Sequence, residues 1–222
     1  MLVKIHKLIA DRGHCSRRKA EQLVEDGKVK INGTVARKGA RVKPDAKITV
    51  EGKPLLGKKK NIYILLNKPL GYVCSNHQAG EEKLVFDLVD IKERLFVVGR
   101  LDKDSHGLVI LTNDGDFTYR LSHPSFECEK EYRVTLDKNL RKEDALLLLK
   151  GVDINEKTPA KAKSVEKIKG KKCTIVLTEG KHRQIRRSFS ALNYTVKDLQ
   201  RVRISNYQLG GLKKGVWRFF AP

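Results

Sequence analysis

An arginine and an aspartate lie two residues apart in a short polar segment of this sequence, between two apolar runs. The first run, residues 96–98, ends just before Arg100 and Asp102, and the second resumes after Gly107 at residues 108–111. This pattern predicts two short buried strands joined by a polar loop. A base and an acid on such a loop could form a reactive site, because protein sites are commonly carried on loops that a rigid scaffold positions.

Three interpretations of this loop compete. Asp102 and Asp104 could simply satisfy the backbone groups of a turn. They could also fill the first and third positions of a calcium loop with Gly107 at the sixth, but Asn113 stands at the twelfth, where a bidentate Glu is needed. Strands rather than long helices flank the loop, so we reject the calcium site. A catalytic aspartate at residue 102 is the third interpretation.

The composition favours a partner that carries negative charge. The chain has 222 residues, 33% of them charged, and a formal net charge of +21. This length can bury one core and a small satellite domain, and so large a positive charge is typical of proteins that bind nucleic acid. A membrane surface is the rival polyanion. However, no apolar run could span a bilayer, no signal peptide is visible, and no basic amphipathic helix with an aromatic face is evident.

The four cysteines are widely scattered and form no C-x-x-C pair. They are Cys15, Cys74, Cys128 and Cys173. Their spacing predicts neither a zinc site nor a disulfide framework, and it favours a reducing compartment, the cytoplasm.

The N-terminal part of the chain is a distinct basic unit. Its first 60 residues hold 17 Lys and Arg against 6 Asp and Glu, a net +11, so about a quarter of the chain carries half of the excess charge. Apolar spacing around Leu8 and Leu23 predicts two short amphipathic helices, and residues 29–50 are typical of a hairpin. We predict a small domain at residues 1–50, followed by a lysine-rich linker with Pro and Gly at 51–60.

Basic side chains gather where the two predicted helices meet. They are Arg12, Arg17, Arg18 and Lys19. Ser16 can cap the second helix and Gly27 can end it. The cluster could be an ordinary solvated charge run, but it coincides with helix N-terminal amides that also favour anions. We therefore predict that it contacts phosphate groups, which would position RNA without reading its bases.

Residues 61–222 are predicted to form the larger domain. Strands are predicted at 62–66, 130–136, 162–168 and 173–177, and helices at 116–121 and 145–150. Tyr132 lies in the second of these strands. It could be a half-buried strand aromatic, or its ring face and hydroxyl could contact a ligand.

A second basic stretch, residues 179–189, has helical spacing. Its apolar side chains share one face with Leu192, and three guanidiniums fall roughly opposite: Arg183, Arg186 and Arg187. This fan, with Lys181 just before it, could be a solvated helix face. It could also be a phosphate clamp that supplies a partner for a catalytic carboxylate.

Several of these segments together resemble one known family. The stretch GRLDKDSHGLVILTNDG is similar to the signature of the bacterial ribosomal-RNA pseudouridine synthases of the RsuA/RluB-like type, which carry an N-terminal alpha-L (ribosomal protein S4-like) RNA-binding domain. The stretch KIHKLIADRGHCSRRKAEQLVEDGKVKING resembles that domain, and N-K-P-x-G, K-x-Y-x-V and EGKHRQIRR resemble further family motifs. Ser188 departs from the apolar residue common there, and the chain stops soon after residues 217–220, which puts target choice in doubt.

The resemblance implies a fold and a set of roles. The fold would be α+β, with the alpha-L domain followed by a synthase domain on a mixed, largely antiparallel sheet. Asp102 would be the catalytic residue, Tyr132 would lie against the target base, and Arg186 would pair with Asp102. Arg100 would fill the place of the flipped-out base, or simply contact a phosphate. The remaining basic residues of both clusters would bind RNA.

The implied reaction converts a uridine of ribosomal RNA to pseudouridine. The bond from the sugar to N1 breaks, the base turns, and C5 joins the sugar, so no redox change or net hydrolysis occurs and we expect no cofactor and no metal. The reaction needs an ionised carboxylate next to the ribose, and Asp102 could attack as a nucleophile or remove a sugar proton. We expect a monomeric cytoplasmic enzyme acting on ribosomal RNA or a pre-ribosomal particle. A non-catalytic RNA-binding or ribosome-assembly factor is the alternative.

Overall fold

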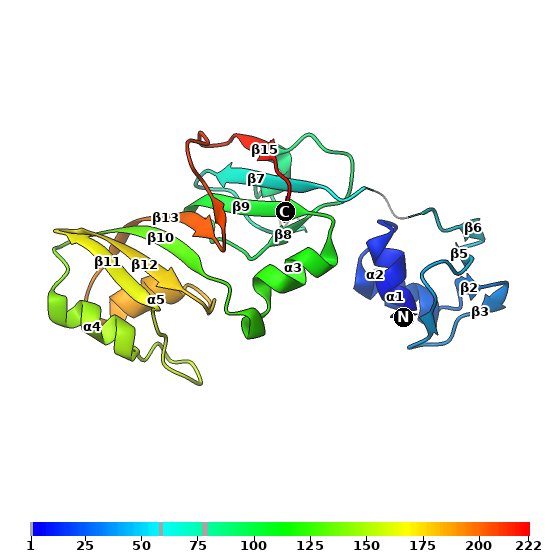
Figure 1. The fold of residues 1–222 in the computed structure, drawn as a ribbon, viewed down its shortest axis with the longest axis horizontal. Coiled ribbons are helices and arrows are strands. Elements are labelled where there is room, and N and C mark those ends of the chain that lie inside the picture. Colours follow the sequence, from blue (N-terminus) through cyan, green and yellow to red (C-terminus); the bar gives the residue numbers. More distant parts are fainter. Residues whose placement is uncertain (1, 58–59, 77–79) are drawn as a thin grey trace. The chain divides into compact units, whose positions relative to one another are not determined.

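The computed structural model describes residues 2–57, 60–76 and 80–222, and in it the chain forms two compact units (Figure 1). Unit 1 contains the chain up to Ile62 together with Lys92–Arg94 and Asn113–Gly115, and unit 2 contains Tyr63–Ile91, Leu95–Thr112 and Asp116–Pro222. No helix among the described residues is long and apolar enough to cross a membrane.

Unit 1 consists of two short helices and small antiparallel sheets. The helices are α1 (Ile5–Asp11) and α2 (Arg17–Glu25), and the four-stranded sheet has the order β3 (Thr34–Val35), β2 (Val29–Ile31), β5 (Ile48–Val50), β6 (Lys53–Pro54). A further pair joins β1 (Val3–Lys4) to β4 (Arg41–Val42). The predicted cap is present, since Ser16 Oγ accepts a hydrogen bond from the backbone N–H of Lys19 at 3.1 Å. The two predicted helices are therefore confirmed.

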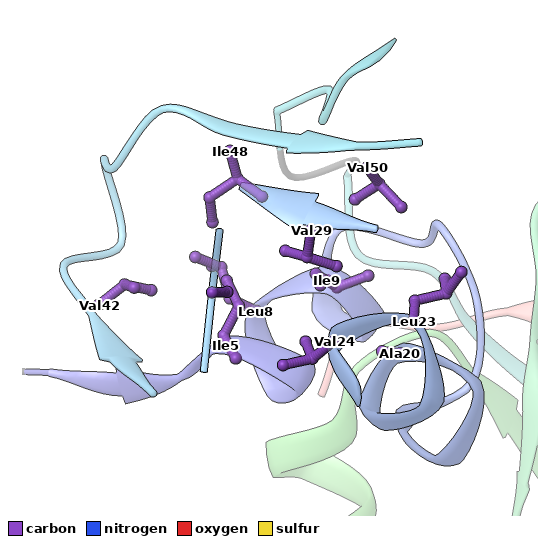
Figure 2. Close-up of a cluster of buried hydrophobic side chains, with 11 residues drawn as sticks. Ile5, Leu8, Ile9, Ala20, Leu23, Val24, Val29, Val42, Ile48 and Val50 are labelled. Atoms are coloured by element: carbon purple, nitrogen blue, oxygen red, sulfur yellow. The ribbon is translucent and has the colours of Figure 1, made fainter. Parts of the chain in front are cut away.

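The core of unit 1 forms where one face of each helix meets the sheet. Figure 2 shows Ile5, Ile9 and Leu23 of the helices pointing toward Val29 and Val50 of the strands, and all of these side chains are buried. Burying such residues stabilises a small unit by roughly 1.5–3 kcal/mol each. The apolar spacing of the sequence thus corresponds to one continuous core.

The end of unit 1 reaches into the segment predicted as a linker. Strand β6 (Lys53–Pro54) pairs with β5, and Leu55 packs against the core of unit 1. Lys58 and Lys59 of that segment lie outside the described residues. The limits of the linker stay a prediction.

Unit 2 is built on a nine-stranded sheet. Its order is β11 (Ser164–Lys169), β12 (Lys172–Leu177), β10 (Lys130–Leu136), β13 (Val196–Ile204), β9 (His106–Thr112), β7 (Tyr63–Lys68), β15 (Trp217–Phe219), with β14 (Tyr207–Gln208) beside β13 and β8 (Phe96–Val98) beside β9. The helices are η1 (Val85–Leu88), α3 (Gly115–Ser122), η2 (Pro124–Phe126), α4 (Lys142–Lys150) and α5 (Gln184–Ala191). All strand pairs except β9 with β13 are antiparallel. The predicted α+β class with a mixed, largely antiparallel sheet is confirmed.

The single parallel pair determines where the polar loop lies. Gly107 of β9 is opposite Arg201 of β13, and a Cβ atom on Gly107 would meet the Arg201 carbonyl oxygen at 2.2 Å. Gly107 also has φ +108°, a conformation that favours glycine. The two backbones can approach closely only because residue 107 has no side chain, and this approach holds the loop between β8 and β9 next to β13.

Candidate active site

A cavity of about 280 Å³ lies in unit 2, beside the loop between β8 and β9. Asp102 lines it from that loop, Tyr132 from β10, and Arg186 from α5. Tyr132 is 30 positions and Arg186 is 84 positions from Asp102 in the sequence, yet all three residues line the same cavity. The volume is just below the range of about 300–1,000 Å³ that is typical of small-molecule sites, so the cavity is large enough for one small planar ring system.

Tyr132 lies in the middle of the sheet. It pairs with Ile175 of β12 on one side and with Arg201 of β13 on the other, and only 8% of its surface is exposed. Tyr132 is therefore a buried strand aromatic rather than a half-buried one. It also lines the cavity, so a contact with a ligand stays a prediction.

The strongest ionic contact at the cavity involves Asp104 and not Asp102. Arg183 donates two hydrogen bonds to the Asp104 carboxylate, at 3.0 and 2.8 Å. Arg186 Nη2 donates to the backbone oxygen of Asp104 at 2.6 Å and to Ser105 Oγ at 3.3 Å, and its Nε lies 3.2 Å from Asp104 Oδ2 outside hydrogen-bond geometry. The direct pair of Arg186 with Asp102 that the resemblance implies is absent, because α5 directs both guanidiniums at the next acidic residue of the loop.

The start of α5 explains this direction. Arg183, the residue before the helix, has the left-handed conformation with φ +50°. Gln184 bonds backward at the same point, accepting from the Lys181 N–H at 3.0 Å and donating to Glu179 Oε1 at 2.6 Å. The sharp turn places Arg183 over the loop, and a non-glycine residue in this conformation is usually held there by its surroundings.

The charges at the cavity shift the pKa values of the groups around it. Partial burial would raise the pKa of the Asp104 carboxyl, but the hydrogen bonds from Arg183 and the charge of Arg186 outweigh burial and lower this pKa. The hydrogen bonds of Asp104 raise the pKa of Arg183, and the negative charge of Asp102 adds to this effect. The side chain of Asp102 makes no hydrogen bond or ion pair with any residue that the structure describes, so the guanidiniums of Arg183 and Arg186 are engaged by Asp104 and its neighbours instead.

Arg201 holds the backbone of the loop that carries Asp102. Its guanidinium donates to the carbonyl oxygens of Leu108 at 2.7 Å, Arg100 at 3.2 Å and Gly99 at 3.1 Å, and only 1% of the residue is exposed. A planar fork with several donors suits this task because it can bond three acceptors in a fixed geometry. The backbone of Gly99 and Arg100, which leads into Asp102, is thus fixed to β13.

A second buried cation supports the other side of the loop. Lys68, at the end of β7, is fully buried and donates from Nζ to the backbone oxygens of Ser105 at 2.7 Å and Pro69 at 3.0 Å. Burial lowers the pKa of Lys68 to about 8, an effect that the charges of Asp104 and Asp102 partly offset. The lysine of the N-K-P-x-G segment therefore contacts protein backbone.

The basic residues predicted to bind RNA differ in how they are engaged. Arg100 is exposed and lines the cavity. Lys181 Nζ donates to the backbone oxygens of Thr158 and Pro159, both at 2.9 Å. Arg187 bonds Glu156 Oε1 at 2.7 Å and the backbone oxygen of Ile154.

In unit 1 the predicted contacts also divide into two kinds. Arg12 donates to the backbone oxygen of Pro44 at 2.6 Å. Arg17, Arg18 and Lys19 are exposed at the start of α2, and Arg17 lies 3.7 Å from Asp11. Only these three side chains of the helix-junction cluster are therefore well exposed to a ligand.

Three residues of the site are not identified by sequence reasoning. The sequence presents Asp104 only as a turn residue or a calcium ligand, although it lies on the same loop as Asp102. Lys68 belongs to the N-K-P-x-G segment, and its acceptor, the Ser105 backbone oxygen, is 37 residues away, so the sequence does not indicate their contact. Arg201 carries no local signal, because its partners Arg100 and Gly99 lie 101 and 102 residues away along the chain.

Comparison with known proteins matches both units. Residues 62–191 match the RNA pseudouridylate synthase family, and residues 3–48 match the S4 domain. The dual-specificity RNA pseudouridine synthase RluF of Escherichia coli strain K12 is 39% identical over 218 residues, covering 97% of this chain and 74% of that protein. The ribosomal large subunit pseudouridine synthase B of Bacillus subtilis strain 168 is 38% identical over 226 residues, covering 99% and 92%.

A solved structure is similar to this chain over nearly its whole length. A crystal structure of a pseudouridylate synthase superposes with a TM-score of 0.73 at 30% identity, covering 99% of this chain and 96% of that one. This chain, with an N-terminal S4 domain, belongs to the RNA pseudouridine synthase family.

Proposed function

We propose that this protein isomerises a uridine of ribosomal RNA to pseudouridine with Asp102 as the catalytic residue. One observation carries the proposal: Asp102 lies on a loop fixed from both sides, in a cavity that can hold one nucleobase and that Tyr132 and Arg186 also line. A target base inside a duplex cannot reach such a cavity, so it must be flipped out, at a cost of a few kcal/mol.

The reaction breaks the C1′–N1 bond and forms a C1′–C5 bond. C5 loses its hydrogen as a proton and N1 gains a proton, so the product is an isomer of uridine with no net change of redox state. The carboxylate of Asp102 acts at the ribose, while the ring of Tyr132 lies against the base. Arg183 and Arg186 hold Asp104, two residues after Asp102, and so fix the loop from which the reacting carboxylate extends. Arg186 acts on Asp102 through the loop backbone, in place of the direct pair expected from the sequence.

Arg100 is the side chain that takes the place of the flipped base or contacts the adjacent phosphate. It is exposed on the cavity rim, two residues before Asp102, and its side chain bonds no described residue. A guanidinium suits both tasks, because its planar face can stack on bases and its edge can bond phosphate oxygens. Substitution of Arg100 would therefore weaken the productive complex more than initial binding.

The basic side chains outside the cavity hold the RNA. Residues 1–50 would act as the RNA-binding domain, with phosphate contacts at Arg17, Arg18 and Lys19, and residues 61–222 as the catalytic domain. Lys181, Arg183, Arg187 and Arg12 bond protein groups, so any phosphate contact they make would be secondary. The net charge of +21 supports binding to a polyanion. We propose that the enzyme acts as a monomer in the cytoplasm, on ribosomal RNA or an assembling particle.

Pseudouridine mapping in ribosomal RNA tests the proposal. Cells that lack this protein should lack one or a few specific pseudouridines, and a plasmid that encodes the wild-type chain should restore them. The Asp102→Asn chain, expressed to the same level, should not restore them. An unchanged pseudouridine map in the deletion strain would refute the proposal and favour a non-catalytic RNA-binding factor.

A further inference from the structure

Three exposed rings form a cluster at the end of α3 and in η2. The ring centroids of Tyr119 and His123 lie 4.6 Å apart, those of Tyr119 and Phe126 5.6 Å, and those of His123 and Phe126 6.4 Å. Tyr119 is 52% exposed and Phe126 50% exposed. Aromatic side chains of this size usually lie in a core, so a contiguous exposed group indicates a contact surface.

The backbone holds these rings in place. The N–H of His123 donates to the Tyr119 oxygen at 3.0 Å, and that of Phe126 donates to the His123 oxygen at 3.2 Å. The N–H of Ser125 donates to His123 Nδ1 at 3.3 Å, which fixes the orientation of the imidazole. Glu127 then adopts the left-handed conformation with φ +45° and closes the turn. The segment that carries the three rings therefore has a defined backbone, and a ligand that binds there need not order it first.

The aromatic cluster borders the cavity of Asp102. His123 lies between Ser122 and Pro124, and both of these line the cavity. Pro124 also lines a second, more open groove, which includes Glu127 and Lys161. This groove and the cavity share Thr178 and Glu179. The cluster begins on α3, which is labelled in Figure 1. Residues that flank the rings in the chain therefore line both hollows, which places the aromatic cluster on the segment that forms their rim.

We propose that the aromatic cluster of Tyr119, His123 and Phe126 is a stacking platform for an unstacked RNA base that neighbours the target uridine. This inference rests on the proposed function. A flipped nucleotide leaves adjacent bases with exposed faces, and every base has a π-face that stacks on an aromatic ring. The strong positive charge of the chain favours an RNA partner over a neutral apolar segment at this rim.

Steady-state kinetics with ring-deleting variants test the platform. The substrate is protein-free ribosomal RNA labelled at C5 of uridine with tritium, from cells that lack this protein, and tritium release is the readout. Stacking contributes about 1–3 kcal/mol per base, so the double variant Tyr119→Ala/Phe126→Ala should lose about tenfold or more in kcat/KM. Tyr119→Phe keeps the ring and should stay within about twofold of wild type.

A matched control separates stacking from general loss of surface. Phe219 of β15 is 58% exposed and does not line the cavity, so Phe219→Ala removes a comparable exposed ring and should leave kcat/KM unchanged. All variants should keep the wild-type thermal midpoint within a few degrees, because the deleted rings are half exposed. A double variant that equals Phe219→Ala in kcat/KM would overturn the platform.

A second readout is independent of turnover. The probe is a single-stranded RNA oligonucleotide with the fluorescent base 2-aminopurine beside a uridine. The wild-type chain and Phe219→Ala should quench its fluorescence, and the double variant should quench it much less. Quenching that is equal in the double variant would overturn the platform, even if wild-type tritium release is normal. A kcat/KM loss confined to ribosomal particles and absent on protein-free RNA would also overturn it, since the surface would then bind a protein. If the wild-type chain releases no tritium but the ring-dependent quenching persists, the proposed reaction fails while the base-stacking site stands.

Discussion

The chain carries two basic clusters that look alike in sequence and differ in what they bind. The helix-junction cluster is Arg12, Arg17, Arg18 and Lys19, and the α5 cluster is Lys181, Arg183, Arg186 and Arg187. In the α5 cluster, every side chain bonds protein acceptors. In the helix-junction cluster, Arg18 and Lys19 are exposed, and their side chains make no hydrogen bond or ion pair with any residue that the structure describes.

This difference teaches that a basic run has two uses that sequence alone does not separate. A cation whose donors are already engaged positions the polypeptide, whereas an exposed one with free donors is available to phosphate. Arg12, which donates to the Pro44 oxygen, belongs with the positioning group despite its place in the first cluster. Substitutions in the two groups should therefore change different kinetic parameters.

The largest effect is expected at Arg201, a buried positioning cation that donates to three backbone carbonyl groups. Arg201→Met should lower kcat by at least about 100-fold and the free energy of unfolding by about 3 kcal/mol or more, because three buried carbonyl groups lose their donor. Single-turnover tritium release and urea unfolding measure the two quantities. Arg203→Met, two residues along β13, is the control and should have a small effect, since Arg203 pairs with Glu129 and Glu131 away from the loop. Normal kcat in Arg201→Met would contradict the positioning role.

Within the α5 cluster, Arg186→Ala should cost far more activity than Arg183→Ala. Arg186 is 15% exposed at its side chain and bonds the loop backbone and Ser105, whereas Arg183 is 38% exposed and bonds only the Asp104 carboxylate. We expect losses in kcat of about 100-fold and about tenfold, respectively. Equal, small losses that appear in KM would mean that both guanidiniums act as phosphate contacts.

The buried Lys68 should give the enzyme a distinctive pH dependence of stability. The pKa of Lys68 is about 8 in the folded chain and 10.5 for a free lysine. Between these values the unfolded state holds more protons, so the contribution of Lys68 to the free energy of unfolding increases as the pH rises. Relative to Lys68→Met, the wild type should gain about 2 kcal/mol between pH 7.5 and 9.5. Urea unfolding at both pH values measures this gain, and an equal change in the two chains would show that Lys68 is not deprotonated.

The smallest effect is expected in the helix-junction cluster. Arg18→Ala/Lys19→Ala should weaken binding to ribosomal RNA by a few-fold and reduce the slope of log Kd against log salt concentration by roughly 1.5, because two counterion-releasing contacts are lost. The value of kcat should not change. Filter binding at several salt concentrations measures the slope. An unaltered slope would remove this cluster from the RNA contacts.

The fold follows from local patterns of the sequence to a large extent. The spacing around Leu8 and Leu23 corresponds to α1 and α2, and the apolar runs on both sides of Asp102 correspond to β8 and β9. These elements are predictable because each has its own period and its own cap or turn. Strand β6 is not, because it consists of two residues, Lys53 and Pro54, that have no strand period.

The site is predictable only in part. The loop signature predicts a catalytic role for Asp102, which stays a prediction. The sequence also predicts that Arg186 pairs with Asp102, whereas in the structure Arg186 donates to the backbone of Asp104 and to Ser105. Whether a guanidinium reaches one carboxylate or another depends on a left-handed turn at Arg183 and on differences of a few ångströms. Such differences depend on tertiary packing, and neither motif nor spacing contains them.

One measurement tests the central claim most directly. Purified wild-type and Asp102→Asn chains, each in excess over C5-tritiated ribosomal RNA from cells lacking the protein, are compared for tritium release and for RNA binding in the same samples. We predict a single burst of release from the wild type, none from Asp102→Asn, and binding that agrees within a few-fold. Release by Asp102→Asn at a rate close to wild type would contradict the assignment of Asp102, and loss of release together with binding would make Asp102 a structural residue.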